Sequence, residues 1–163
     1  MSPAQRYFLY KTEPSTFSIR DLEHAPQQTT CWEGVRNYQA RNMLRDRSQV
    51  GNPVLIYHSS VAIPGVVGAG IICRDRYPDP SQFDPTSPYF DPRASVSQPR
   101  WWTVDVQWRA TFAHICTRAM LRAHPETQAM ALLQRGSRLS VFEITQAEFQ
   151  ATLQLVQERW SPK

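Results

Sequence analysis

The residues best suited to chemistry lie in the run 32–42, WEGVRNYQARN, which opens with a tryptophan and a glycine and continues into arginine-rich sequence. Trp32 offers a flat π-face to a base or a cation. Gly34 lets another group approach the backbone closely. Arg36 carries a planar, permanently charged guanidinium, which suits phosphate and planar ligands. The same pattern fits a core tryptophan beside a solvated helix face, so this run alone leaves both interpretations open.

Three further polar clusters lie at the ends of apolar segments: Lys11-Thr12-Glu13, His58-Ser59 and Arg135-Gly136-Ser137-Arg138. A site assembled from strand ends would bring such groups together. The last cluster combines two guanidiniums, a hydroxyl and a glycine backbone, which fits a phosphate. A charged turn before a strand would have the same composition, and the first cluster also fits a strand end that enters solvent.

Most catalytic and metal-binding patterns are missing. The chain has no Cys-x-x-Cys pair, no phosphate-binding loop of the Gly-x-x-x-x-Gly-Lys type, no Gly-x-Gly-x-x-Gly and no Gly-x-Ser-x-Gly. Its four histidines have no partner at metal-ligand spacing: His24, His58, His114 and His124. We therefore expect no metal and no cofactor. A Cys–His nucleophile pair is neither indicated nor eliminated.

The composition is that of a globular protein. The 163 residues are 41% hydrophobic and 20% charged, and we expect one domain over residues 1–163. The net charge of +4 permits a polyanionic partner without requiring one. Three widely spaced cysteines suggest no disulfide framework and favour a reducing cytoplasm. No signal pattern and no run of about 20 apolar residues occurs, so we expect a soluble protein without membrane contact, and a monomer.

Periodicity and capping signals predict the elements that must position these clusters. Strands are expected at 6–10, 31–32, 54–57, 65–73, 101–112 and 141–144. Helices are expected at 18–24, 37–47, 117–123, 126–133 and 145–158. The order is mixed and lacks a repeated βαβ unit. It favours an α+β fold with a strongly bent, mostly antiparallel sheet, close to a small barrel and flanked by helices.

Residues 78–99 differ from the rest of the chain because they hold six prolines and three aspartates. Long loops in compact domains are uncommon and often functional. Phe83, Tyr89 and Phe90 lie in this loop, whereas disordered linkers have few aromatic residues. We therefore expect the loop to be part of the domain.

Several of these segments together resemble one family, the EVE domain family. The matching segments are Lys11-Thr12-Glu13-Pro14, Trp32 to Asn42, Tyr57-His58-Ser59, Pro64-Gly65-Val66-Val67-Gly68, Tyr77-Pro78-Asp79-Pro80, Phe83-Asp84-Pro85, Tyr89-Phe90-Asp91-Pro92 and Arg135 to Val141. The resemblance covers about residues 6–157 and implies a PUA-like pseudo-barrel. It also implies binding of modified bases in nucleic acid, with 5-methylcytosine in DNA the leading candidate. Two departures are Thr12, where serine is common, and a second tryptophan beside Trp101.

On this resemblance a flipped base would enter a pocket at the strand ends. Trp32 would stack on it, and either Trp101 or Trp102 would form a second wall. Thr12, Asn37 and Ser59 would contact the base edge. Arg36, Arg135 and Arg138 would hold flanking phosphates. The full set of predicted site residues is Lys11, Thr12, Glu13, Trp32, Gly34, Val35, Arg36, Asn37, His58, Ser59, Trp101, Trp102, Arg135, Ser137 and Arg138.

Two other functions stay open at this point. One is an enzyme that acts on a modified nucleotide or base, with Glu13 or His58 as a general base. The other is a module that binds a protein or a small acidic metabolite through its arginines. The sequence does not distinguish DNA from RNA, one modified base from another, or Trp101 from Trp102 as the second wall.

Overall fold

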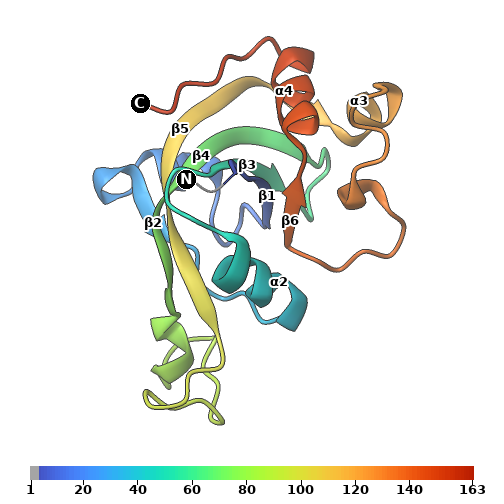
Figure 1. Ribbon diagram of the computed structural model, residues 1–163. Helices are drawn as coiled ribbons and strands as arrows, with labels where there is room; N and C mark the ends of the chain where they lie inside the picture. Colours follow the sequence, from blue (N-terminus) through green and yellow to red (C-terminus); the bar gives the residue numbers. More distant parts are fainter. Residues whose placement is uncertain (1–3) are drawn as a thin grey trace.

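A bent, mostly antiparallel sheet forms the centre of the protein (Figure 1). The computed structural model describes residues 4–163. In this range six strands lie in the order β2-β5-β4-β3-β1-β6. Their bounds are β1 Tyr7–Thr12, β2 Thr29–Cys31, β3 Pro53–His58, β4 Gly65–Pro78, β5 Trp102–Thr117 and β6 Val141–Ile144.

The pairing confirms the predicted α+β class. β1 and β3 are parallel, and the other neighbouring strands are antiparallel. No pairing joins the edge strands β2 and β6 among the described residues, so the sheet curls without closing. The predicted PUA-like architecture is therefore an open, bent sheet.

A glycine in β4 permits the bend. β4 and β5 pair along most of their lengths with several shifts of register. A Cβ atom added to Gly68 would lie 2.5 Å from the carbonyl oxygen of Ala110 and 2.6 Å from Ile19. Only a residue without a side chain allows this close approach.

The two faces of the sheet bury different clusters because strand side chains alternate. Phe8, Tyr10 and Ile56 belong to the cluster that includes residues of α1 and α2, whereas Leu9 and Leu55 belong to the cluster that includes residues of α3 and α4. The helices are α1 Ile19–Glu23, α2 Tyr38–Asn42, α3 Arg118–Ala123 and α4 Gln146–Leu155. Shorter turns are η1 Pro26–Gln28, the π-helical η2 Met43–Arg47, η3 Pro80–Phe83 and η4 Ala131–Leu133.

Capping signals located the helix starts well. Ser18 with Asp21 and Thr145 with Glu148 form the predicted capping boxes, and Thr117 caps α3. Element lengths were predicted less well. β4 continues to Pro78 and β5 to Thr117 because each strand pairs with the other, which overrides their polar sequence. The predicted helix at 37–47 becomes π-helical at Met43, and the one at 126–133 is only the short turn η4.

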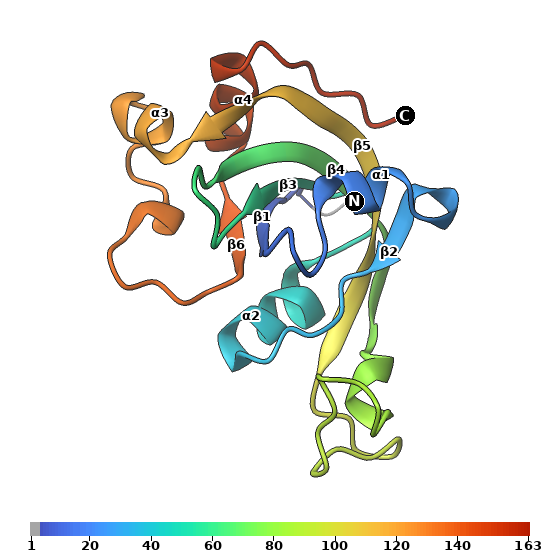
Figure 2. The same ribbon diagram turned by 180° about the vertical axis from the view of Figure 1, so that it is seen from behind.

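The β4–β5 connection projects from the sheet as an arm, which we define as residues 79–101 (Figures 1 and 2). Gln82, fully buried, holds its two ends together. Its amide nitrogen donates to the carbonyl oxygens of Asp79 and Trp101, both at 2.8 Å. Its amide oxygen accepts from the backbone N–H groups of Arg100 and Trp101. The proline-rich loop is therefore ordered, as its aromatic content predicted.

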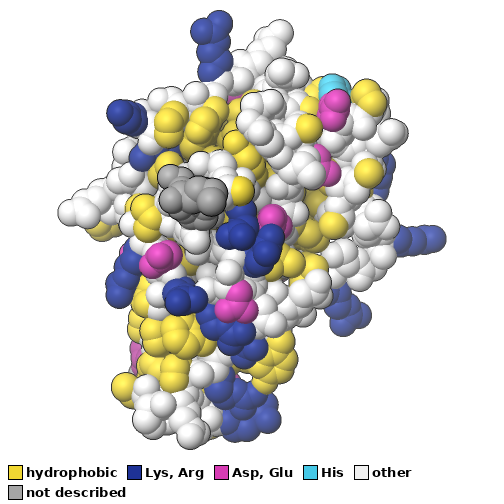
Figure 3. Space-filling model, viewed as in Figure 1, with side chains coloured by type: hydrophobic (Ala, Val, Ile, Leu, Met, Phe, Trp, Pro, Cys, Tyr) yellow, Lys and Arg dark blue, Asp and Glu magenta, His cyan; other side chains and the backbone are white. Residues whose placement is uncertain are grey.

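Lys and Arg side chains form a broken column over the face that carries α2 and the arm, with fewer acidic side chains among them (Figure 3). Among the described residues no helix is long and apolar enough to cross a bilayer. The three cysteines are all free thiols.

Candidate functional site

A cavity of about 680 Å³ opens where β1 ends, beside the segment that leads into α2. This volume is within the range of small-molecule sites. It is lined by Lys11, Thr12, Glu13, Thr16, Phe17, Thr30, Cys31, Trp32, Glu33, Gly34, Val35, Arg36, Asn37, Pro88, Tyr89, Arg138 and Ser140. Nine of the fifteen predicted site residues are in this lining: Lys11, Thr12, Glu13, Trp32, Gly34, Val35, Arg36, Asn37 and Arg138.

Backbone pairing brings these distant segments together. The N–H group of Lys11 donates to the carbonyl oxygen of Ser140, which ties the segment before β6 to the end of β1. The N–H group of Trp32 donates to the carbonyl oxygen of Val104, which continues the β2–β5 pairing into the cavity wall. The predicted meeting of strand ends therefore occurs.

Trp32 is mainly a core residue. The residue is only 7% exposed, and its ring centroid lies 5.4 Å from that of Tyr10 and 6.3 Å from that of Phe17. Its carbonyl oxygen accepts a 2.7 Å hydrogen bond from Thr103. Trp32 contributes to the cavity lining, but little of the indole can be reached by a ligand.

Two of the predicted residues outside the lining lie at the end of β3. His58 Nε2 accepts the backbone N–H of Ile19 at 3.1 Å, and partial burial lowers the pKa of His58. The backbone N–H of Ser59 donates to the carbonyl oxygen of Thr12. Both residues thus join the end of β3 to its neighbours. Arg135 and Ser137 lie in the turn before β6, outside the lining.

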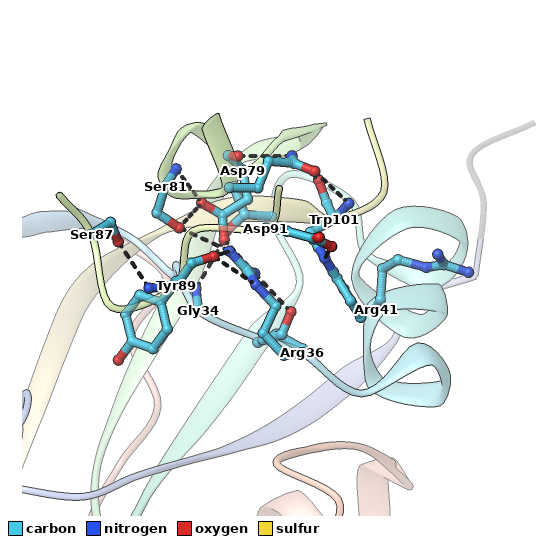
Figure 4. A network of polar contacts seen from close by, with 12 residues as sticks. Gly34, Arg36, Arg41, Asp79, Ser81, Ser87, Tyr89, Asp91 and Trp101 are labelled. Atoms are coloured by element: carbon cyan, nitrogen blue, oxygen red, sulfur yellow. Dashed lines mark hydrogen bonds and ion pairs between the residues drawn. The ribbon is translucent and has the colours of Figure 1, made fainter. Parts of the chain in front are cut away.

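Arg36 has a structural role that the sequence analysis did not predict. The sequence suggested a phosphate contact, but the guanidinium donates to Asp79 Oδ2 at 3.1 Å, to Ser81 Oγ at 3.1 Å and to the carbonyl oxygen of Tyr89 at 2.7 Å. It also lies 5.2 Å from the centroid of the Trp101 ring. Figure 4 shows this network. Arg36 therefore fastens the arm to the cavity wall.

Asp79 is the buried centre of the same network. Its side chain is 1% exposed and accepts the backbone N–H of Gly34 at 2.9 Å as well as the Arg36 guanidinium. It also accepts from the backbone N–H and the hydroxyl of Ser81. A buried carboxylate is tolerated only when it is paired and hydrogen-bonded in this way.

Neither Trp101 nor Trp102, the two residues predicted as the second wall, lines the cavity. Trp101 is buried behind it, stacked on Tyr38 at 5.0 Å, and its Nε1 donates to Asp91 at 2.8 Å. Trp102 pairs with Pro78 inside the sheet. The aromatic residue that the arm does bring to the lining is Tyr89, which our candidate set omitted. The presence of aromatic residues in a proline-rich loop was the available signal.

The cavity has polar groups suited to a base edge. The Thr12 hydroxyl donates to the carbonyl oxygen of Phe17 at 2.7 Å, so its oxygen remains an acceptor for a ligand. Asn37 Oδ1 accepts the backbone N–H of Ala40 as the N-cap of α2, so its amide N–H groups remain donors. Glu33 adds a carboxyl group whose pKa is raised by burial and by Asp79.

Cations lie on one side of the cavity. Lys11 is half-buried, with Nζ 5.9 Å from the centroid of the Tyr57 ring, and Arg118 donates to the Tyr57 hydroxyl at 3.1 Å. Burial, and then the charge of Arg118, lowers the pKa of Lys11. Arg138 is exposed on the lining. In the described part of the chain, His, Cys, Asp and Glu form no group of three able to hold a metal ion.

A bent, mostly antiparallel sheet flanked by helices, with a polar and aromatic cavity at its strand ends, is the architecture expected from the sequence. The EVE domain model matches residues 6–155, and the chain belongs to the EVE domain family.

Thymocyte nuclear protein 1 of Homo sapiens is 39% identical over 166 residues, which cover 91% of this chain and 73% of that protein. A structure of the human THYN1 protein in complex with 5-methylcytosine-containing DNA has a TM-score of 0.88 and 36% identity, and the match covers 95% of this chain and 99% of that one. A hypothetical protein from Leishmania major has a TM-score of 0.87 and 42% identity, covering 94% and 96% of the two chains.

Proposed function

We propose that the cavity binds one modified base of DNA, with 5-methylcytosine the first candidate, without chemical change to the base. The observation that carries this proposal is the cavity itself: it combines aromatic, polar and cationic groups in a fold whose human relative is found in complex with 5-methylcytosine DNA. A base inside a duplex is inaccessible to such a cavity, so it must turn out of the stack. We therefore expect single-stranded or mispaired sites to bind more tightly than a paired duplex.

The polar groups fit the edge of cytosine. Cytosine has an exocyclic amine that donates and ring positions that accept. The Thr12 oxygen can accept from that amine, because its own proton is already used. The Asn37 amide can donate to the acceptor positions, because its oxygen is already used by α2. Lys11 and Arg138 supply positive charge for the flanking phosphates.

The methyl group alone adds modest affinity. Burying one methyl group is worth about 0.8 kcal/mol, which is a few-fold in the dissociation constant. Larger discrimination requires that the cavity enclose the methyl group tightly. We expect the protein to prefer 5-methylcytosine over cytosine by a few-fold to about tenfold.

The test is a pair of binding titrations with oligonucleotides that differ only in one 5-methylcytosine opposite a mismatched base. The proposal predicts tighter binding of the methylated strand by the parent, and weaker binding of both strands by Asn37→Asp, which removes the amide donor and adds a negative charge. Arg122→Gln, on the exposed surface of α3, is the control and should bind as the parent does. Equal binding of both strands by the parent protein would contradict the proposal.

A further inference from the structure

Tyr89 is the aromatic residue that the arm places in the cavity lining. Tyr89 is half-buried, whereas Trp32 is buried and only 7% exposed. A stacking surface must be reachable by the ligand. Of these two residues, Tyr89 therefore has the ring that can meet an entering base more fully.

Two backbone contacts fix the position of Tyr89. Its carbonyl oxygen accepts from Arg36 Nη2 at 2.7 Å and from Nε at 3.2 Å. Its own N–H donates to Ser87 Oγ at 3.1 Å. Asp79 in turn holds the Arg36 guanidinium at 3.1 Å (Figure 4). The tyrosine is thus placed by the Arg36–Asp79 ion pair, in which only the carboxylate is fully buried, and not by its side chain alone.

Gly34 makes room for the ring. A Cβ atom on Gly34 would lie 2.6 to 2.8 Å from three ring carbons of Tyr89, closer than atoms can approach. Gly34 also has a φ of +87°, a conformation that favours glycine. The segment Trp32-Glu33-Gly34 and the arm therefore pack closely against each other. Any side chain at position 34 would displace Tyr89.

We infer that Tyr89 is the second aromatic wall of the cavity, that Gly34, Arg36 and Asp79 are its positioning residues, and that its ring determines affinity for the planar modified base. This inference rests on the proposed function and adds to it the identity of the stacking residue. The role of second wall, which the sequence analysis gave to Trp101 or Trp102, belongs to Tyr89. Trp101 packs against the Arg36 guanidinium and so supports Tyr89 indirectly.

The experiment measures binding of the methylated, mismatched oligonucleotide to Tyr89→Ala, Tyr89→Phe, Gly34→Ala and the double variant Gly34→Ala/Tyr89→Ala. Removing a stacking ring weakens binding by about tenfold or more. Tyr89→Phe keeps the ring and should bind within about twofold of the parent. Gly34→Ala should weaken binding by pushing the ring away, and should have little further effect once Tyr89 is alanine, because additivity fails for residues that act through one contact.

Phe90→Ala is the matched control, since Phe90 is the next aromatic residue of the arm and is outside the lining. It should bind as the parent does. Binding of Tyr89→Ala that equals that of the parent would overturn the inference, as would a Gly34→Ala effect that is the same with and without Tyr89. If the parent protein itself shows no preference for the methylated strand, the proposed function fails instead, so the two failures are distinguishable.

Discussion

At the scale of single residues, burial and pairing decide what Trp32 and Arg36 do in this fold. Trp32 and Arg36 look like ligand-binding groups, yet one is mostly core and the other is paired with a buried carboxylate. Composition cannot reveal this, because the partners Tyr10 and Asp79 are distant in the sequence. Lys11, Thr12 and Glu13, at the end of β1, do line the cavity. Their position could be expected from the sequence because a strand end is a local signal.

Trp32→Ala should unfold more easily than the parent by about 3–5 kcal/mol, the usual cost of removing a large buried aromatic side chain. Chemical denaturation measures this free energy. Trp102→Ala, at a half-buried position of β5, is the comparison and should lose less. A loss below about 1 kcal/mol for Trp32→Ala would show that the indole is not part of the core. This expected cost also makes Trp32→Ala a poor probe of binding.

At the scale of elements, the arm was predicted as an ordered loop, but its attachment was not. Proline and aromatic content are visible in the sequence, whereas the closing contacts of Gln82 and Asp79 depend on side chains that have no local pattern. The lengths of β4 and β5 were predicted incorrectly for a related reason. β4 and β5 extend into polar sequence because each supplies the other with hydrogen-bonding partners.

Asp79→Asn should loosen the arm. The substitution keeps the shape but removes the charge that faces the partly exposed Arg36 guanidinium, so we expect a loss of about 2–3 kcal/mol in unfolding free energy. Limited proteolysis should then cut within residues 84–99 faster than in the parent. Asp84→Asn, in the exposed part of the arm, is the control. An unchanged cleavage rate in Asp79→Asn would mean that the ion pair does not hold the arm.

The contact between His58 and α1 should make stability depend on pH. Burial lowers the pKa of His58 in the folded state, so the unfolded state, with the ordinary value of about 6.5, binds the proton more readily. The stabilisation is fully present above pH 6.5 and is lost as the pH falls toward the lowered folded value. The stability difference between the parent and His58→Gln should therefore shrink from pH 7.5 to pH 5. A difference that grows on acidification would reverse this account.

At the scale of the whole molecule, one architecture gathers the cavity, the arm and the cationic residues at the strand ends of a bent sheet. The α+β class and the family were accessible from the sequence because motifs over most of the chain agree with the strand and helix periodicity. The open edge of the sheet, and the choice of Tyr89 over either tryptophan, follow only from three-dimensional packing.

The central claim is that the modified base itself enters the cavity. The most direct measurement uses an oligonucleotide whose single 5-methylcytosine has a ¹³C-labelled methyl group, observed by NMR during titration with the protein. Because the cavity is lined by aromatic rings, the methyl resonance should shift strongly on saturation with the parent protein, and shift much less with Tyr89→Ala. A methyl resonance that stays at its free position while the DNA is bound would contradict the claim.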